Sequence, residues 1–554
     1  MIRRSALDRL DWQAPLFAAR LNRLALMRLG APAPTGPALR VQRNHAFEGV
    51  ASVLAPFFEF AGFALRPVLG DYDDSLSLPE EPYAAAVVWL DFARYSRLDD
   101  DQLVAWLLER LDVLRANAGG PLVVANSPDV GPRAEMLNAA LEAWAARTAG
   151  AALLRLDRMA RDLGDVALAE HRAAVTGTRY ADPLCLEAAR ALVFEVLGAF
   201  HADPVKALAV DLDNTLYAGV LGEDGAEGVR LTEGHAELQQ EIARLAETGV
   251  LVSILSRNEA ADVQALFERR QDFPLRPEHV ASWQVSWGEK SDALAAAAAG
   301  FNIAPESFLF IDDNVGELAQ TSIVYAGLRL LHAGERGEDT ARALAKHPGL
   351  PRDGLAFAGR SADLGANVQR AALAQEAVDS ESYLRALKVE LLFALDPAED
   401  RGRLAEISRK TNQFNLALRR LDEVEVDRYL SLPDRCVVHV RLADRLADSG
   451  SVAALFGRRE EGALIVDELC ISCRALGRRL EDLMVAEAVR HAARRLGVNR
   501  IGFEYRRGPR NQPALSWLER FLGVGATEDA GRLEAGLDRF AAVPQTGVEV
   551  NWIS

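Results

Sequence analysis

Short apolar runs alternate with amphipathic segments along the first 200 residues. After a helical lead-in across residues 1–35, the pattern predicts helices over 47–61 and 99–116. Apolar strands are expected at 39–41, 63–68, 83–90, 121–126 and 152–156. Strand and helix in this alternation are typical of a parallel sheet with helices on its faces, so residues 1–200 are predicted to form a first α/β domain.

A second domain is expected over residues 204–345, where apolar runs end abruptly in polar residues. The run Ala207–Val210 leads into Asp211 and Asp213, and the run 250–255 leads into Ser256. Runs of this kind are typical of buried parallel strands, and ligands of such sheets bind beyond the carboxyl ends of the strands. We therefore expect Asp211 and Asp213 at that edge, on a chain that leaves the strand there.

The third part of the chain has a different rhythm. Residues 346–384 are expected to be a linker that ends in a helix, and residues 385–554 a domain in which several strands precede an apolar helix through Leu496. This order favours a mixed α+β sheet.

Composition narrows the classes of protein. The 554 residues are 49% hydrophobic and 26% charged, as in ordinary globular proteins, and the net charge of −17 argues against binding nucleic acid or an anionic membrane. Four scattered cysteines are too few for a disulfide framework, which fits a reducing cytoplasm. The sequence shows neither a signal peptide nor an apolar run of membrane-spanning length, so a cytoplasmic location is expected.

Four polar clusters follow one another in the second domain: Asp211-x-Asp213, Ser256, Lys290 and Asp312-Asp313. Together they resemble the four motifs of the HAD superfamily, in order and with plausible spacing. The resemblance predicts a Rossmann-like fold and phosphoryl transfer, which needs a nucleophile, neutralisation of phosphate charge and a proton for the leaving oxygen.

The motif residues take these roles as expectations. Asp211 would attack phosphorus, and Asp213 would act as general acid and then base. Mg²⁺ would be bound by Asp211, the backbone carbonyl of Asp213 and Asp312, with Asp313 holding a metal-bound water. The expected phosphate-binding residues are Thr215, Ser256, Arg257, Asn258 and Lys290.

The spacing of the motifs leaves no room for a large cap. About 40 residues separate Asp213 from Ser256, and about 20 separate Lys290 from Asp312. The site should therefore be open, or covered by another domain or a partner protein.

Longer sequence motifs in the second domain resemble those of the FkbH-like family of the HAD superfamily. That family reads Asp-Leu-Asp-Asn-Thr-Leu-Trp-Gly-Gly-Val, where this chain has Tyr217 and Ala218 in place of Trp-Gly, and Gly222-Glu-Asp-Gly225 is intact. The family's Ser-Lys-Asn becomes Ser256-Arg-Asn258, and its Asp-Asp-Asn-Pro becomes Asp312-Asp-Asn-Val315.

The third domain agrees with that family through Lys410-Thr-Asn-Gln-Phe-Asn-Leu416, Ser472-Cys-Arg-Ala-Leu-Gly-Arg478 and Tyr505 with Asn511. The resemblance implies a GNAT-like third domain and a bifunctional enzyme of polyketide or glycan biosynthesis. Such an enzyme takes the acyl group of 1,3-bisphosphoglycerate, removes phosphate and loads D-glyceryl onto the thiol of an acyl carrier protein. The residues expected to bind the acyl group or the carrier are Lys410, Asn412, Gln413, Arg474, Gly477, Arg478 and Asn511.

Cys473 is the candidate acyl-carrying nucleophile, because a thiolate beside Arg474 at a helix N-terminus has a lowered pKa. A buried core cysteine is the alternative, and it is the one we expect for Cys470. Seven arginines could form a basic face for an acidic carrier or could simply be solvated: Arg490, Arg494, Arg495, Arg500, Arg506, Arg507 and Arg510.

The first domain, with a polar turn over residues 42–45 after its first strand, is similar to the SGNH-hydrolase fold. The usual nucleophilic serine and the late Asp-x-x-His pair are missing, which favours a non-catalytic recognition domain. For the whole chain, three alternatives to glyceryl loading stay open: a stand-alone HAD phosphatase, a transferase to an amino sugar, and a carrier-binding scaffold without turnover.

Overall fold

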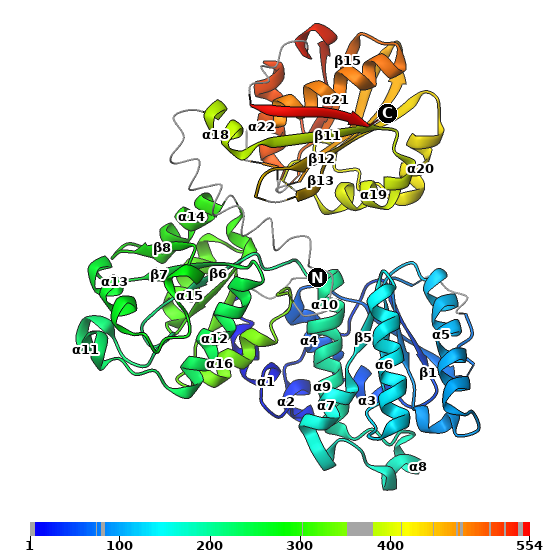
Figure 1. The fold of residues 1–554 in the computed structure, drawn as a ribbon, viewed down its shortest axis with the longest axis vertical. Helices are drawn as coiled ribbons and strands as arrows, with labels where there is room; N and C mark the ends of the chain where they lie inside the picture. The colour runs from blue at the N-terminus through cyan, green and yellow to red at the C-terminus, as the bar shows by residue number, and fades with distance from the viewer. Residues whose placement is uncertain are drawn as a thin grey trace. The chain divides into compact units, whose positions relative to one another are not determined.

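The computed structural model describes residues 6–73, 75–78, 83–301, 303–351, 380–411, 413–446, 448–472, 475–476, 480–508, 511–525, 528–540 and 547–553. These residues form two compact units: the first contains two five-stranded sheets, and the second contains one seven-stranded sheet. Figure 1 shows the three sheets with their helices. Within the described residues, none of the helices combines the length and apolarity that a membrane crossing needs.

The first sheet is entirely parallel, with the order β2-β1-β3-β4-β5. Its strands are β1 (Ala38–Arg43), β2 (Arg66–Tyr72), β3 (Ala85–Trp89), β4 (Leu122–Ala125) and β5 (Ala151–Leu154). Its helices are α1 (Leu10–Leu16), α2 (Arg23–Arg28), α3 (Glu48–Ala51), α4 (Leu54–Ala61), α5 (Asp100–Ala116), α6 (Pro132–Arg147), α7 (Leu156–Leu163), α8 (Ala173–Thr176), α9 (Asp182–Ala191) and α10 (Gly198–His201), with a π-helical turn over Leu192–Leu197. Every residue of β3 and β4 is buried, as expected when helices cover both faces of a sheet.

Three details of this domain differ from the expectation. The helix predicted over 47–61 is two helices, α3 and α4, which part at Ser52 and the β-branched Val53. Strand β2 lies about three residues later than predicted, on the edge of the sheet, where burial constrains the sequence least. Helix α6 was missed, although Pro132 at its first turn and buried Leu137, Leu141 and Trp144 at helical spacing signal it.

The second sheet is also entirely parallel, with the order β10-β9-β6-β7-β8. Its elements are β6 (Ala207–Val210), α11 (Leu221–Gly228), α12 (Glu233–Glu247), β7 (Leu251–Ser256), α13 (Ala260–Arg269), β8 (Ser282–Val285), α14 (Lys290–Phe301), β9 (Phe308–Asp312), α15 (Val315–Val324), β10 (Arg329–His332) and α16 (Gly337–Ala345). The chain runs from central β6 outward to β8, then returns to add β9 and β10 on the other side of β6. Sheets of this kind usually bind ligands at such a reversal, beyond the carboxyl ends of the two strands on either side of it, here β6 and β9.

The buried strands expected at 207–210 and 250–255 are confirmed within a residue or two as β6 and β7. Most of the glycine-rich stretch 218–228 forms α11. Gly225, with φ of +70°, interrupts that helix. Only α11 and α12 separate Asp213 from β7, and between Lys290 and Asp312 the described residues form α14 and a short turn over Pro305–Ser307. The expectation that no large cap is inserted is confirmed for these described residues.

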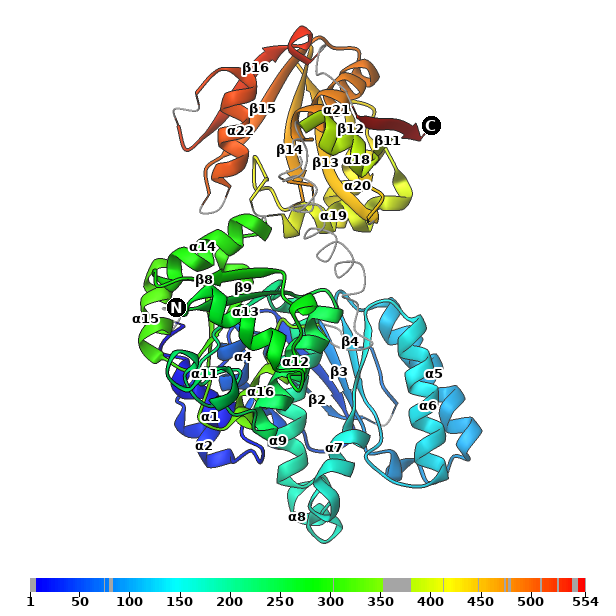
Figure 2. The ribbon, with the colours of Figure 1, turned by 60° about the vertical axis from the view of Figure 1, so that its left-hand side comes forward.

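The third sheet has the order β16-β15-β14-β13-β12-β11-β17. Its strands are β11 (Val389–Leu395), β12 (Arg435–Ala443), β13 (Asp448–Glu460), β14 (Ala463–Ile471), β15 (Arg500–Arg506), β16 (Ala530–Gly536) and β17 (Val548–Ile553); its helices are α18 (Ser380–Leu387), α19 (Arg401–Lys410), α20 (Glu423–Ser431), α21 (Glu481–Leu496) and α22 (Gln512–Leu522). The β14–β15 and β11–β17 pairs are parallel and the others antiparallel, so the mixed sheet predicted from the sequence is confirmed. Figure 2 shows β14, β15 and β16 side by side.

The first two sheets share one continuous apolar core, and the lead-in helix α1 joins them. Trp12, Leu16 and Phe17 are buried there as predicted, whereas Leu24 is 56% exposed. Gln13 binds the end of β10 like an added strand: its Nε2 donates to the His332 carbonyl at 2.7 Å, and the His332 N–H donates to its Oε1 at 2.9 Å. The first domain is therefore built into the support of the second.

A close approach of two helix starts provides a test of this packing. A Cβ on Gly337 of α16 would lie 2.5 Å from backbone atoms of Gly234 and His235 on α12, and a Cβ on Gly234 would collide with the backbone of Glu338. We expect Gly234→Ala to lower the free energy of unfolding by about 1–3 kcal/mol, measured by urea titration. Gly300 of α14 has open space around it, so Gly300→Ala should be neutral or stabilising by up to about 1 kcal/mol. Equal effects of the two substitutions would contradict the packing.

Candidate active site of the second domain

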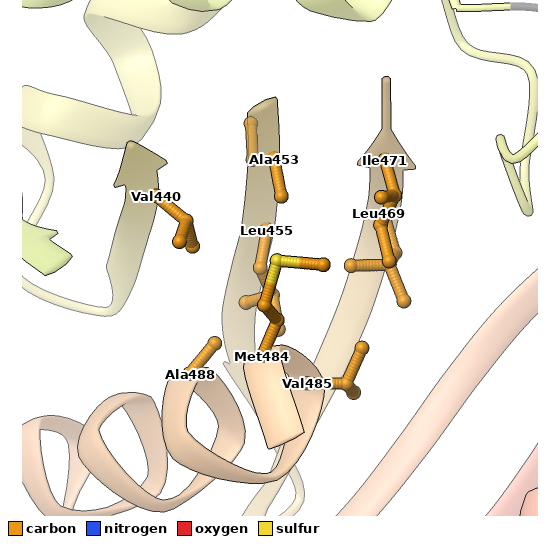
Figure 3. A pocket seen from close by; sticks show the side chains of 9 residues that line it. Val440, Ala453, Leu455, Leu469, Ile471, Met484, Val485 and Ala488 are labelled. Carbon is orange, nitrogen blue, oxygen red and sulfur yellow. The ribbon is translucent and has the colours of Figure 1, made fainter. Parts of the chain in front are cut away.

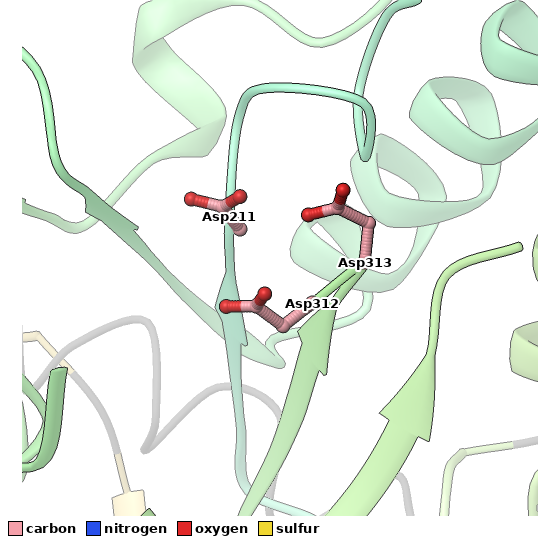
Figure 4. A group of neighbouring side chains, drawn as sticks. All are labelled: Asp211, Asp312 and Asp313. Carbon is pink, nitrogen blue, oxygen red and sulfur yellow. The ribbon is translucent and has the colours of Figure 1, made fainter. Parts of the chain in front are cut away.

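Three carboxylates meet at the carboxyl ends of neighbouring strands β6 and β9. Oxygen atoms of Asp211, Asp312 and Asp313 all lie within 4.8 Å of one another (Figure 4). Asp211 and Asp312 are buried and Asp313 is partly buried. Asp211 follows β6 directly, and Asp312 is the last residue of β9, so pairing of the two strands brings the side chains together. Carboxylates at this spacing are suited to a hard divalent cation such as Mg²⁺.

The Lys290 ammonium lies between two of these carboxylates. Its Nζ is 2.8 Å from Asp211 Oδ1 and 2.6 Å from Asp312 Oδ2, and all three side chains are buried. Lys290 begins α14, and the Ser286 N–H just before that helix donates to the Ser256 carbonyl at 3.0 Å. One ammonium among three carboxylates leaves a formal deficit of two positive charges when all are ionised, which a divalent cation would balance.

Burial and like charges shift the pKa values of this cluster. Burial, reinforced by neighbouring Asp312 and opposed by Lys290, raises the pKa of Asp211 to about 7. Burial and Asp312 also raise the pKa of Asp313. For Lys290, burial favours the neutral amine, but the two carboxylates outweigh it and raise the pKa of the ammonium. The lysine is therefore charged at neutral pH, whereas the carboxylates repel one another. A bound cation would reduce that repulsion.

The Asp213 side chain is held by hydrogen bonds in the turn after β6. Its Oδ1 accepts from the Tyr217 hydroxyl at 2.7 Å and from the Leu221 N–H at 2.9 Å, and its Oδ2 accepts from Asn258 Nδ2 at 2.8 Å. The chain turns sharply after it, with Asn214 at φ of +52°. Three donors thus hold the Asp213 carboxylate toward the start of α11, apart from the three clustered carboxylates. Burial and Asp213 raise the pKa of the Tyr217 phenol, which keeps it a donor.

The expected phosphate-binding residues divide into two groups. Ser256 is buried at the end of β7 and its Oγ accepts from Asn258 Nδ2 at 3.0 Å, so Asn258 joins Ser256 to Asp213. The Thr215 hydroxyl is buried without a hydrogen-bond partner among the described residues, which leaves it free for a ligand. Arg257 instead points into ion pairs, 3.0 Å from Glu317 and 3.8 Å from Glu289. Its predicted role as a phosphate ligand does not fit this geometry, because carboxylates already hold its guanidinium.

Two supporting residues were missed by sequence reasoning. Tyr217 stands where the resembled family has tryptophan, and only the structure shows its hydroxyl bound to Asp213. His332 Nε2 lies 3.0 Å from the backbone carbonyl of Asp313, and Gln13 holds the His332 backbone in turn. No local sequence pattern predicts a contact between residues 13 and 332.

In the third domain, several predicted residues fall outside the described residues: Asn412, Cys473, Arg474, Gly477 and Arg478. Their roles stay predictions. Lys410 is exposed and bound to Glu406 at 2.8 Å, and Gln413 is partly buried. Burial raises the pKa of the Cys470 thiol well above its usual value, and the side chain is fully buried, so the expectation of a core cysteine is confirmed.

Asn511 has a structural position rather than that of a carrier ligand. It is fully buried, its Nδ2 donates to the carbonyls of Asn415 and Arg506 at 2.8 and 2.9 Å, and its Oδ1 accepts from the Gly508 N–H at 2.8 Å. Backbone groups thus occupy both ends of the amide. The sequence suggested a binding residue, but the structure shows a tie between loops.

A segment that Asn511 contacts, Phe414–Leu416, fills a gap between two diverging strands. β14 and β15 pair only over Ala463–Val466 and Arg500–Phe503. Beyond these residues the segment Phe414–Leu416 lies between them: the Leu416 N–H donates to Leu469 at 3.1 Å, the Ile471 N–H to Phe414 at 2.9 Å, and the Arg506 N–H to Leu416 at 2.8 Å. The chain itself fills the space between these strands.

A small apolar cavity lies nearby, where Met484 and Ala488 of α21 face Leu455 and Leu469 of the sheet (Figure 3). Its volume is about 10 Å³, which is at most the size of one water molecule. The cavity is therefore too small to hold an acyl group in this arrangement.

The arginines proposed as a basic face are largely paired. Arg490 pairs with Glu487, Arg495 with Asp396 at 3.4 Å, Arg500 with Glu534 at 3.0 Å and Arg507 with Asp529 at 3.8 Å. Arg510 lies outside the described residues. These partners reduce the positive charge on which carrier docking was predicted.

The corresponding edge of the first sheet is closed by buried polar contacts. Arg179 pairs with Asp91 at 2.9 Å and with Asp129 at 2.6 Å, and His45 Nδ1 lies 2.7 Å from the Thr178 hydroxyl. Burial lowers the pKa of His45 to about 3, so its imidazole is neutral at pH 7. The polar residues at this edge are engaged with one another, and the non-catalytic role stays a prediction.

No protein-family model matches the chain, and no curated protein matches it. A solved structure of the N-terminal part of protein BF1531 from Bacteroides fragilis, containing a phosphatase domain and complexed with Mg, is 17% identical, covers 61% of this chain and 98% of its own, and has a TM-score of 0.49. An acetyltransferase of the GNAT family from Streptococcus pneumoniae is 12% identical over 26% of this chain and 99% of its own, with a TM-score of 0.20. Spermidine N-acetyltransferase SpeG from Vibrio cholerae is 11% identical over 27% of this chain and 95% of its own, also at 0.20. At these identities and scores, the activity rests on the geometry of the site.

The buried position of Lys290 gives a measurable expectation. Replacing it in Lys290→Met leaves two buried carboxylates without their counterion, so the free energy of unfolding of the first unit should fall by about 3 kcal/mol, followed by tryptophan fluorescence in urea. Lys346→Met is the control, because Lys346 is partly exposed and 4.0 Å from Glu187; its loss should cost less than about 1 kcal/mol. Similar losses in the two variants would show that Lys290 does not neutralise the cluster.

Proposed function

We propose that the second domain is a Mg²⁺-dependent phosphatase of phosphate monoesters. The observation that carries the proposal is the convergence of Asp211, Asp312, Asp313 and Lys290 at the point where the strand order reverses, with Ser256 at the end of the next strand. The order of these residues along the chain also matches the HAD motifs. A Mg²⁺ ion held by the three carboxylates would offset negative charge on the phosphoryl oxygens.

The residues of the chain supply the remaining chemistry. An Asp211 carboxylate oxygen attacks phosphorus and the bond to the leaving alcohol breaks, while Asp213 supplies the proton that the alcohol needs. Water then attacks the aspartyl phosphate, Asp213 takes its proton, and phosphate leaves. Lys290 and Ser256 bind phosphoryl oxygens by charge and by hydrogen bond. The Asn258 amide donates to both Ser256 and Asp213. A phosphate bound at Ser256 would therefore be separated from the general acid Asp213 by a single side chain.

For the whole chain, we propose that the phosphate belongs to a glyceryl group derived from 1,3-bisphosphoglycerate, and that the third domain loads glyceryl onto the thiol of an acyl carrier protein. Two observations support this proposal. The third domain has sequence motifs that resemble those of the FkbH-like family, and the described part of the second domain has no inserted cap. An uncapped site suits a phosphate presented on a large carrier. Glyceryl transfer to an amino sugar remains the alternative acceptor chemistry.

Phosphatase activity is tested first. The full chain should release phosphate from monoesters with Mg²⁺ and should stop when EDTA removes the metal. Asp211→Asn should lower kcat by about 10³-fold or more, and Asp213→Asn by about 10²–10⁴-fold, in a phosphate-release assay. Asp292→Asn, an exposed carboxylate on α14, serves as the control and should retain activity. Full activity of Asp211→Asn would exclude it as the nucleophile.

Transfer is tested separately by intact mass. The chain, Mg²⁺, 1,3-bisphosphoglycerate and a holo carrier protein should give a glyceryl adduct on the carrier thiol. Cys473→Ala should abolish the adduct if its thiolate carries the acyl group, whereas Cys470→Ala should leave transfer chemistry in place. Phosphate release without any adduct would leave a stand-alone phosphatase, and neither signal would leave a scaffold.

A further inference from the structure

Four charged side chains lie within four positions of motif residues along the chain. Arg257 follows Ser256, Glu289 precedes Lys290, Glu259 follows Asn258, and Glu317 lies in the first turn of α15 after Asp313. We call these four residues the outer ring. Arg257 joins two of its members, at 3.0 Å from Glu317 and 3.8 Å from Glu289. Three carboxylates and one guanidinium give the ring a formal charge of −2.

Trp287 adds an aromatic face to this ring. It is 68% exposed, and its indole Nε1 donates to Glu259 Oε1 at 2.8 Å, which fixes the direction of the ring. The residue lies three positions before Lys290, so its Cα is at most about 10 Å from the Cα of the lysine. By comparison, Trp283 on β8 packs edge-on against Phe267, with 5.0 Å between ring centres. Trp287 is thus an oriented aromatic side chain exposed beside the phosphate site.

A substrate meets two different electrostatic environments at this place. Its phosphate group would bind Lys290 and Ser256, beside the three carboxylates whose spacing suits a cation. Its organic part then lies beside a ring of net negative charge, where a second carboxylate or phosphate is repelled. An uncharged organic part is not repelled, and its apolar face can lie on the indole.

We propose that the outer ring and Trp287 select phosphate monoesters whose organic part is uncharged and presents an apolar face, and disfavour substrates with a second anionic group. The inference rests on the proposed phosphatase function and names its substrate class. A phosphoglyceryl thioester fits this class because its carboxyl carbon carries no free charge, whereas free 3-phosphoglycerate does not fit.

Two substrates that differ in one carboxylate test the charge selection. With the full chain and Mg²⁺, kcat/KM for glycerol 3-phosphate should exceed that for 3-phosphoglycerate by about five-fold or more. Glu289→Gln and Glu259→Gln should each narrow this ratio by about two- to five-fold, because each removes one repelling charge. Glu278→Gln, an exposed carboxylate before β8 at the opposite end of the sheet, should leave the ratio unchanged.

The aromatic face is tested with 4-nitrophenyl phosphate. Trp287→Ala should raise KM by about five- to ten-fold and affect kcat much less, while Trp287→Phe should restore most of the affinity. Ile323→Ala removes another exposed apolar side chain, near the far end of α15, and should change neither KM nor kcat. Equal kcat/KM for the two glycerol-type substrates, or a ratio unmoved by both glutamate variants, would overturn the inference. No hydrolysis of any of the three substrates would instead refute the phosphatase function.

Discussion

The ammonium of Lys290 between Asp211 and Asp312 is the interaction on which the second domain depends. Two carboxylates from adjacent buried strands would repel each other in a medium of low polarity, and the lysine makes their proximity tolerable. The same side chain fixes the start of α14 against the ends of β6 and β9. The arrangement is nevertheless incomplete in charge, since Asp313 adds a third carboxylate. A site that is stable but short of positive charge is prepared for a cation and for an anionic phosphoryl group.

The path of the chain explains why so few residues are needed to build this site. The parallel direction of β6, β7 and β9 places their carboxyl ends along one edge, and the reversal of the strand order puts β9 next to β6. Polar clusters spread over about 100 residues therefore come together at that edge. Support from outside the sheet completes it. Gln13 extends the edge of β10, and His332 on that strand holds the carbonyl of Asp313. The first domain thus contributes to the geometry of the second.

The sequence predicted the centre of the site better than its surroundings, for a physical reason. The central residues lie where an apolar run ends or a helix begins: Asp211, Ser256, Lys290 and Asp312. Such boundaries can be recognised in a sequence because buried strands and helices have characteristic apolar patterns. The orientation of Asp213 toward Tyr217 and Asn258 depends on a turn with Asn214 at positive φ, which no periodicity encodes. Arg257 was assigned to phosphate because of its charge, yet its partners Glu289 and Glu317 lie on other elements and could not be paired from the sequence. The same limit applies to Asn511, whose backbone partners come from residues up to 96 positions away.

The environments of Arg257 and Trp287 together connect these surroundings with function. An arginine left free beside the phosphate site would attract any polyanion, but the carboxylates of Glu289 and Glu317 hold this one and reverse the sign of the ring. In the proposed selection, specificity would come from repulsion of the wrong substrates as well as from attraction of the phosphate. The carboxylate of a free acid would be repelled by the outer ring, whereas a thioester of the same acid has no carboxylate to repel. The charge that the outer ring is proposed to repel is the charge that a thioester lacks, so the proposed selection would favour a phosphoglyceryl thioester over the free acid.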